Sequence, residues 1–173
     1  MSSPSRRIDS SQLLDFLELV GRELPREVVL VAAGGTAMTL LGVKPTTRDI
    51  DFTGPAEDIE VFSRALRTVP HGMKVDTWRD GQVFSQFLPS DYLARSRKIK
   101  RLPNIELRVL HPVDIVVTKI GRLDDRDKQD IRDCIRKLKI RKSAVAKRAS
   151  EVVYVGNEEN FRYHVGLVLT QFF

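Results

Sequence analysis

The sequence has a single cysteine, Cys134, and only three histidines in 173 residues. One thiol excludes a disulfide within the chain and a cysteine zinc cluster, and cysteine-poor chains are typical of reducing compartments. Cys134 stands between charged residues in a helical pattern, so a catalytic thiol has no support. His71, His111 and His164 share no spacing typical of metal ligands, and we expect structural roles for them.

Long hydrophobic runs are also absent. No apolar stretch approaches the roughly 20 residues of a membrane-spanning helix, and residues 1–7 lack the apolar centre of a signal peptide. We therefore expect a cytoplasmic protein without a membrane partner. The hydrophobic share of 42% is high enough for a packed core, and the length suits one domain or a core with a small appendage.

The charge that is present favours a polyanionic partner. Lysine and arginine number 29 against 23 acidic residues, which leaves a net charge of +6. This balance suits RNA, DNA or nucleotides, and it equally suits a basic protein without such a partner. Basic residues gather in segments 95–101 and 137–148. Each segment is either a solvated face or a surface that contacts RNA.

Hydrophobic periodicity predicts a small sheet followed by helices. Helical spacing is found in residues 9–24, where Asp9 and Gln12 can form a capping box, and in 55–69, 112–120, 131–148 and 158–171. Strands are predicted at 28–33, 48–52, 73–78, 82–88 and 105–110, with a hairpin-like turn at 79–81. This order predicts an α+β fold whose small mixed sheet, flanked by helices, occupies residues 1–110. Residues 111–173 would form a helical C-terminal part packed on that core as one compact unit.

Two glycines, Gly34 and Gly35, end the apolar strand 28–33, which we expect to be buried on both faces because it does not alternate. Thr36 can cap the short helix that follows, to about Leu41. A glycine turn that leads into a helix N-terminus presents free N–H groups to a phosphate. Most Gly-Gly pairs are only turns, however, so the interpretation needs a second feature.

The second feature is the pair Asp49 and Asp51 in the next predicted strand. Strand alternation places both carboxylates on one face and Ile50 on the other. Two carboxylates side by side repel each other unless a cation lies between them. We interpret the pair as a site for Mg²⁺ or Mn²⁺, which prefer oxygen ligands; two solvated acids on an edge strand are the alternative. The neighbouring Arg48 could simply neutralise Asp49 or Asp51.

A third carboxylate would complete a site of the kind that catalyses phosphoryl transfer. Asp76 in segment 73–78 and Glu106 in segment 105–110 are the two candidates. A β-α-β step would place segment 73–78 beside the acid pair, which favours Asp76. Glu106 stays open as the competitor, and Asp76 could also be a plain surface acid.

This pattern of a strand, Gly-Gly, a short helix and Asp-x-Asp resembles the DNA polymerase β-like nucleotidyltransferase superfamily. The string Gly34-Gly35-Thr36-Ala37 … Thr47-Arg48-Asp49-Ile50-Asp51-Phe52 is similar, more narrowly, to the AbiEii/MenT-type nucleotidyltransferases and relatives of unassigned function. Those proteins also carry a later Lys … Arg-Asp-Lys-x-Asp-Ile element. It is matched here by Lys119 and by Arg126-Asp127-Lys128-Gln129-Asp130-Ile131. Together the two elements frame roughly residues 28–131.

The resemblance implies a transferase that uses an NTP and releases pyrophosphate. The residues it assigns to catalysis and to the metal are Asp49, Asp51 and Asp76. The residues it assigns to nucleotide binding are Gly34, Gly35, Thr36, Arg48, Lys119, Arg126, Asp127 and Asp130. The acceptor would be a hydroxyl group of an RNA, such as tRNA, or of a protein.

The resemblance leaves the biological role open. The toxin members of the family have a larger helical C-terminal part than this chain, so a toxin role, with an antitoxin-like partner protein, is one possibility among several. The alternative to catalysis is a module on the same fold that binds nucleotide, RNA or a partner protein. The intact acid pair favours the enzyme.

Overall fold

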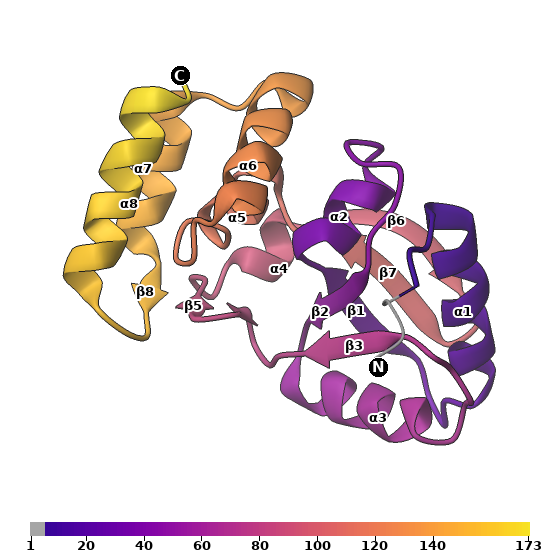
Figure 1. Ribbon diagram of the computed structural model, residues 1–173. Coiled ribbons are helices and arrows are strands. Elements are labelled where there is room, and N and C mark those ends of the chain that lie inside the picture. Colours follow the sequence, from indigo (N-terminus) through magenta and orange to yellow (C-terminus); the bar gives the residue numbers. More distant parts are fainter. Residues whose placement is uncertain (1–5) are drawn as a thin grey trace, which may run out of the picture.

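The computed structural model describes residues 6–173, and its centre is a five-stranded sheet (Figure 1). Its strands are β1 Val28–Ala32, β2 Asp49–Thr53, β3 Lys74–Thr77, β6 Arg97–Leu102 and β7 Ile105–Val109. They lie in the order β3-β2-β1-β7-β6. The pairs β1–β7 and β2–β3 are parallel, whereas β1–β2 and β6–β7 are antiparallel. The predicted α+β class with a small mixed sheet is confirmed.

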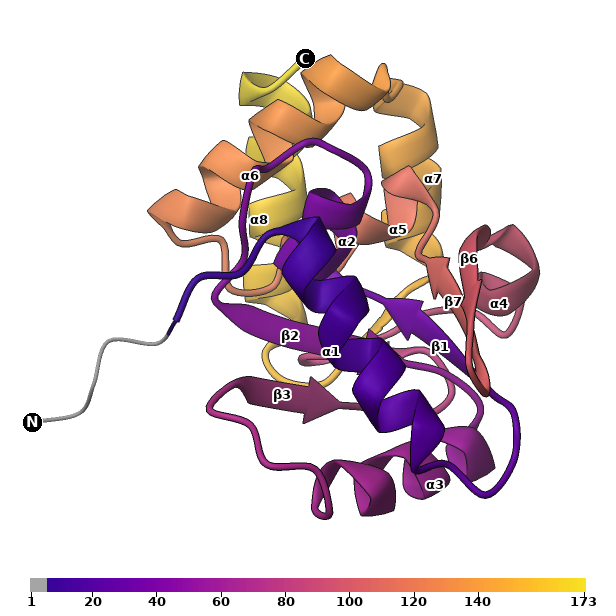
Figure 2. The ribbon, with the colours of Figure 1, turned by 90° about the vertical axis from the view of Figure 1, so that its right-hand side faces the viewer.

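Helices cover the sheet and continue beyond it. They are α1 Ser10–Arg22, α2 Gly34–Leu40, α3 Ala56–Leu66, α4 Tyr92–Arg95, α5 Pro112–Val117, α6 Asp125–Leu138, α7 Lys142–Glu151 and α8 Glu158–Gln171. α1 contacts α3, and both pack on the sheet, which α1 crosses in Figure 2. α5 packs against α2, α6 and α7, and α8 packs on α7. The C-terminal helices therefore form a group beside the sheet (Figure 1).

A second, three-stranded sheet links the two halves of the chain. It consists of β4 Gln82–Val83, β5 Gln86–Phe87 and β8 Val153–Tyr154, all antiparallel. The predicted return of segment 82–88 along segment 73–78 is therefore wrong. Asp80 and Gly81 take positive φ angles of 53° and 88°, and the chain then turns away to pair with β8. The C-terminal part thus includes a short strand, and its division from the core at residue 110 stays a prediction.

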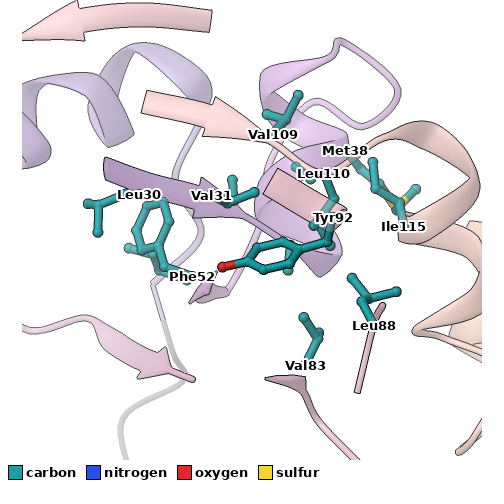
Figure 3. Close-up of a cluster of buried hydrophobic side chains, with 14 of the residues drawn as sticks. Leu30, Val31, Met38, Phe52, Val83, Leu88, Tyr92, Val109, Leu110 and Ile115 are labelled. Atoms are coloured by element: carbon teal, nitrogen blue, oxygen red, sulfur yellow. The ribbon is translucent and has the colours of Figure 1, made fainter. Parts of the chain in front are cut away.

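The core explains why β1 lies at the centre of the sheet. Four of its five side chains, at positions 28 and 30–32, have no exposed surface, as the unbroken apolar run predicted. In the cluster of Figure 3, Val31 of β1 and Phe52 of β2 lie with Met38 of α2, Ile115 of α5 and Val83 of β4. Each such side chain contributes roughly 1.5–3 kcal/mol by its burial. The β4 strand is therefore anchored in the same core as the main sheet.

Of the two helix caps predicted from the sequence, one is present in the structure and the other is not. The predicted capping box of Asp9 and Gln12 at the start of α1 is confirmed. The prediction that Thr36 caps α2 is wrong, because the N-cap residue is Ala33 and makes no side-chain capping bond. Thr36 lies inside the first turn of α2, and its hydroxyl forms hydrogen bonds to the backbone of β2 instead. In the part of the chain that the structure describes, none of the helices has both the length and the apolar character needed to cross a membrane.

Candidate active site

Three carboxylates come together where β2 and β3 run side by side. The register of these parallel strands pairs Asp51 with Asp76, as expected from the β-α-β step through α3. Asp49 stands two residues before Asp51 and therefore on the same face of β2. All three side chains line one open pocket of about 190 Å³. The structure thus brings the three predicted acids to a common site.

The sheet topology separates the two candidates for the third acid. Glu106 lies on β7, which is divided from β2 by β1. Its carboxylate stands within 4.0 Å of cationic groups of Lys98, Arg101 and Arg108, and it does not line the pocket. Asp76 is therefore the acid that stands beside Asp-x-Asp, whereas Glu106 belongs to a separate group of surface ion pairs.

Asp51 is the most perturbed carboxyl of the site. It is only 4% exposed, and its Oδ1 atom has no hydrogen-bond partner in the described part of the chain. Burial, and then the charges of Asp76 and Asp49, raise its pKa from 3.8 to about 7, against the opposing charges of Lys119 and Lys74. An ionised carboxylate in this position is unfavourable without a cation.

The two glycines create the space that this carboxylate occupies. Gly34 has a φ angle of +54°, and a Cβ atom there would stand 2.9 Å from Oδ2 of Asp51. A Cβ atom at Gly35 would stand 2.8 Å from Oγ1 of Thr47. Gly35 lines the pocket, but Gly34 does not. The close approach of α2 to β2 is therefore a structural reason for both glycines, and phosphate binding by this turn stays a prediction.

Two threonines fix the backbone of the Asp-x-Asp strand. The hydroxyl of Thr36 donates to the carbonyl oxygen of Asp49 at 3.1 Å and accepts from the backbone N–H of Asp51 at 2.9 Å. The hydroxyl of Thr47 donates to the same carbonyl oxygen at 2.8 Å. Thr36 is fully buried and lies outside the pocket lining. Its place in the structure is that of a residue that positions the acids, not one that faces a ligand.

The opposite wall of the pocket is formed around Lys119, which follows α5. Its side chain is 6% exposed, and Nζ lies 2.9 Å from Oδ2 of Asp130 and 4.0 Å from Asp127. Lys44, from the loop between α2 and β2, lies 3.1 Å from Oδ1 of Asp130. Asp130 is thus held between two lysines. The downstream element, Lys119 with residues 126–131, is brought to the pocket, as predicted. Its second acid, Asp130, is already neutralised by the two lysines.

Arg122 extends this wall, and sequence reasoning missed it. Its Nε and Nη2 atoms donate to the two carboxylate oxygens of Asp127 at 2.7 and 2.9 Å. These hydrogen bonds are the main reason why the pKa of Arg122 is raised. Asp127 also forms a capping box with Asp124 at the start of α6. The only signal for Arg122 was its place between Lys119 and Arg126 in the matched element.

The pocket as a whole suits an anion with a bound cation. Five acidic side chains line it, against seven basic ones, Arg7, Lys44, Arg48, Lys74, Lys119, Arg122 and Arg126. Arg48 and Arg126 are exposed and form no ion pair with any residue from 6 to 173. The alternative in which Arg48 neutralises Asp49 or Asp51 is therefore not supported, because no such ion pair forms among the described residues. Both arginines are available to a phosphate.

Metal binding at these acids would draw further ligands from a bound substrate and from water. Within the described range, no three His, Cys, Asp or Glu side chains form a group that could bind an ion by themselves. Mg²⁺ commonly takes one or two protein carboxylates and completes its octahedral shell with water and substrate phosphate oxygens. The unpartnered oxygen of Asp51, beside Asp49 and Asp76, fits that arrangement. The identity of the metal stays a prediction.

Comparison with known proteins assigns the chain to a family. Residues 11–168 match a protein-family model described as "Nucleotidyltransferase of unknown function (DUF6036)". No curated protein and no solved structure matches the chain. The predicted nucleotidyltransferase relationship is confirmed, while the narrower resemblance to AbiEii/MenT-type proteins stays a prediction. The matched region contains both walls of the pocket, and the chain belongs to this family of nucleotidyltransferases of unknown function.

Proposed function

We propose that this protein transfers a nucleoside monophosphate from an NTP to a hydroxyl group, with Mg²⁺ or Mn²⁺ as cofactor. The observation that carries the proposal is the pairing of Asp51 with Asp76 across β2 and β3, next to Asp49, in a pocket with an excess of basic side chains. Membership of a nucleotidyltransferase family supports the same reaction class. A purely structural role for Asp51 would not explain why its buried Oδ1 atom has no hydrogen-bond partner among the described residues.

The chemistry is a displacement at the α-phosphorus of the NTP. The acceptor oxygen forms a bond to this phosphorus, the bond from phosphorus to the oxygen bridging the β-phosphate breaks, and pyrophosphate leaves. Asp76, whose side chain is 41% exposed, accepts the proton of the attacking hydroxyl. Arg48 and Arg126 bind phosphate oxygens, and Lys119 adds positive charge from the opposite wall. A bound divalent ion, held by Asp49 and Asp51, would neutralise the charge of the triphosphate.

An RNA hydroxyl is the acceptor that the charge of the chain supports best. The net charge is +6, and exposed basic residues flank α6 and α7, among them Lys139, Arg141 and Lys142. Such surfaces attract a polyanion without reading its sequence. A protein hydroxyl is the second possible acceptor, and its use would show as label in protein instead of RNA.

The test is a transfer assay with each α-labelled NTP, Mg²⁺, and total RNA or total protein as acceptor. Wild type should label an acceptor, and the double variant Asp49→Asn/Asp51→Asn should not. Transfer by the double variant at the wild-type rate would refute the catalytic role of the acids. NTP binding that persists without Mg²⁺, with no turnover on any acceptor, would favour the alternative, a nucleotide-binding or RNA-binding module. Growth arrest on expression that depends on Asp51 would add a toxin role.

A further inference from the structure

A second cavity, of about 310 Å³, adjoins the pocket that holds the acids. It is lined by Phe84, Ser85, Gln86, Thr118, Lys119, Arg122, Asp127 and Tyr154. Four of these, Phe84, Lys119, Arg122 and Asp127, also line the acidic pocket. The two hollows therefore share a wall, and a ligand with two chemically different ends could occupy both. We refer to the second hollow as the side cavity.

Phe84 occupies a backbone position that a phenylalanine rarely adopts. β4 and β5 are joined by a two-residue loop, Phe84-Ser85, and Phe84 is its first residue with a φ angle of 54°. Gly, Asn and Asp are the usual residues at this position of a tight hairpin. The flanking residues Val83 and Gln86 are buried and hold the loop in place. A bulky residue kept in an unfavourable conformation suggests a role for its side chain.

The ring of Phe84 stands between the side cavity and the acids. An edge contact with Trp78 holds it, with ring centroids 4.9 Å apart, and the guanidinium of Arg122 lies 5.8 Å from its centroid. Its Cζ atom lies 3.8 Å from the position that a Cβ atom on Gly34 would take, and the same Cβ atom would meet Asp51. The ring therefore reaches from the side cavity to the edge of the acid site.

Tyr154 is the second aromatic residue in the lining of the side cavity, and the buried amide of Gln86 in the same lining is already engaged. Tyr154 is stacked on Phe161, with centroids 4.9 Å apart and planes 10° from parallel. The amide of Gln86, with its nitrogen turned to the carbonyl oxygens of Val83 and Thr118, accepts from the N–H of Gly121. The hydroxyl of Ser85 is exposed and makes no hydrogen bond to the described residues. The side cavity thus offers the flat aromatic surfaces of Phe84 and Tyr154, while its charged groups Lys119, Arg122 and Asp127 are paired with acids or bases of the protein.

We propose that the side cavity holds the nucleobase of an NTP whose triphosphate lies in the acidic pocket. This inference rests on the proposed function, because it takes the nucleotide as the ligand of that pocket. A nucleobase is flat and aromatic, and it gains affinity by stacking on aromatic side chains and on arginine. Phe84 and Tyr154 provide the aromatic surface, Arg122 joins the base end to the phosphate end, and Ser85 offers a hydrogen bond to the base edge.

The test compares NTPs with tripolyphosphate, which has the phosphates but no base. Calorimetric titration in Mg²⁺ would use ATP, GTP, CTP and UTP one at a time. At least one NTP should bind the wild type about tenfold more tightly than tripolyphosphate does. Its base should also change the emission of Trp78, which is the only tryptophan and contacts Phe84. Equal binding of all NTPs and tripolyphosphate would overturn the base site while leaving the proposed function intact.

Single-residue variants test whether the higher affinity for the NTP arises at Phe84. Phe84→Leu should remove the advantage of the NTP while the affinity for tripolyphosphate stays within about twofold, and Phe84→Tyr should restore it. The matched control is Phe87→Leu, at an exposed phenylalanine of β5 that lines neither hollow. Thermal melting reports whether each variant folds. If Phe84→Leu weakens both ligands equally, the base site is refuted; if the wild type binds neither ligand, the proposed function itself fails.

Discussion

The two walls of the pocket carry carboxylates in opposite states. On the sheet wall, Oδ1 of Asp51 has no partner among residues 6–173, and Asp76 has Lys74 at 3.7 Å as its nearest cationic partner in that range. On the helical wall, Asp127 and Asp130 each accept from a basic side chain at 2.9 Å or less. The sequence gives both walls the same residue type, and only their partners differ.

This difference shows which acids are free for a ligand. A carboxylate already paired with lysine or arginine has little to offer a second cation, whereas an unpaired buried carboxylate is stabilised by one. We infer that Asp127 and Asp130 position Lys119 and Arg122, and that Asp49, Asp51 and Asp76 face the metal and substrate. The segment from Lys119 to Asp130 would then serve the site through its basic side chains.

Substitution of the sheet wall should have the largest effect on activity. Asp51→Asn keeps the shape of the side chain but removes its charge, so transfer should fall about a thousandfold. Labelled NTP transfer to an RNA acceptor measures this loss. The control is Asp15→Asn, at an exposed carboxylate of α1, which should leave the rate unchanged. Retention of more than about a tenth of the wild-type rate in Asp51→Asn would contradict the assignment.

The carboxyl of Asp51 should also make the free energy of unfolding depend on pH. Its pKa is 3.8 when unfolded and about 7 when folded, so its favourable contribution is fully present below about pH 4 and is lost as pH rises through about 7. The loss amounts to up to about 4 kcal/mol.

Urea denaturation at several pH values, in EDTA, would measure this dependence. Asp51→Asn should become progressively more stable than wild type between about pH 4 and 7, and Mg²⁺ at pH 8 should stabilise wild type more than the variant. A difference between the two proteins that does not change with pH would argue against the perturbed carboxyl.

Substitution of the helical wall should instead damage folding. Asp130→Ala leaves Lys119 buried without its closest partner, and removal of one partner from a buried pair costs roughly 3 kcal/mol. The control is Asp133→Ala on the same helix, where the ion pair with Arg136 lies at the surface and less than about 1 kcal/mol is expected. Equal losses in the unfolding free energy would remove the distinction between the two walls.

The smallest effect is expected at the unpaired arginines. Arg48→Ala or Arg126→Ala should weaken NTP binding about tenfold each. The unfolding free energy should change by less than about 0.5 kcal/mol, since both side chains are exposed and unpaired in the described chain. Arg67→Ala, outside the pocket, is the control. A large loss of stability with unchanged affinity would reverse the roles given to these residues.

The sequence by itself determined the features that depend on near neighbours. The capping box at Asp9, the buried strand β1, and the common face of Asp49 and Asp51 follow from local chain geometry, and the structure contains all of them. The parallel step from β2 to β3, which brings Asp76 to the pair, was also predictable, because the crossover helix between them is short and regular.

Only the tertiary structure decided which polar groups are engaged and which are free. The hydroxyl of Thr36 holds β2 in place, β5 pairs with β8, and Lys44 neutralises Asp130 of α6. Each of these outcomes depends on atoms that belong to distant parts of the chain and meet only in the folded protein. Residue type alone cannot show this, because an aspartate has the same chemistry in the sequence whether folding gives it a lysine or leaves it unpaired.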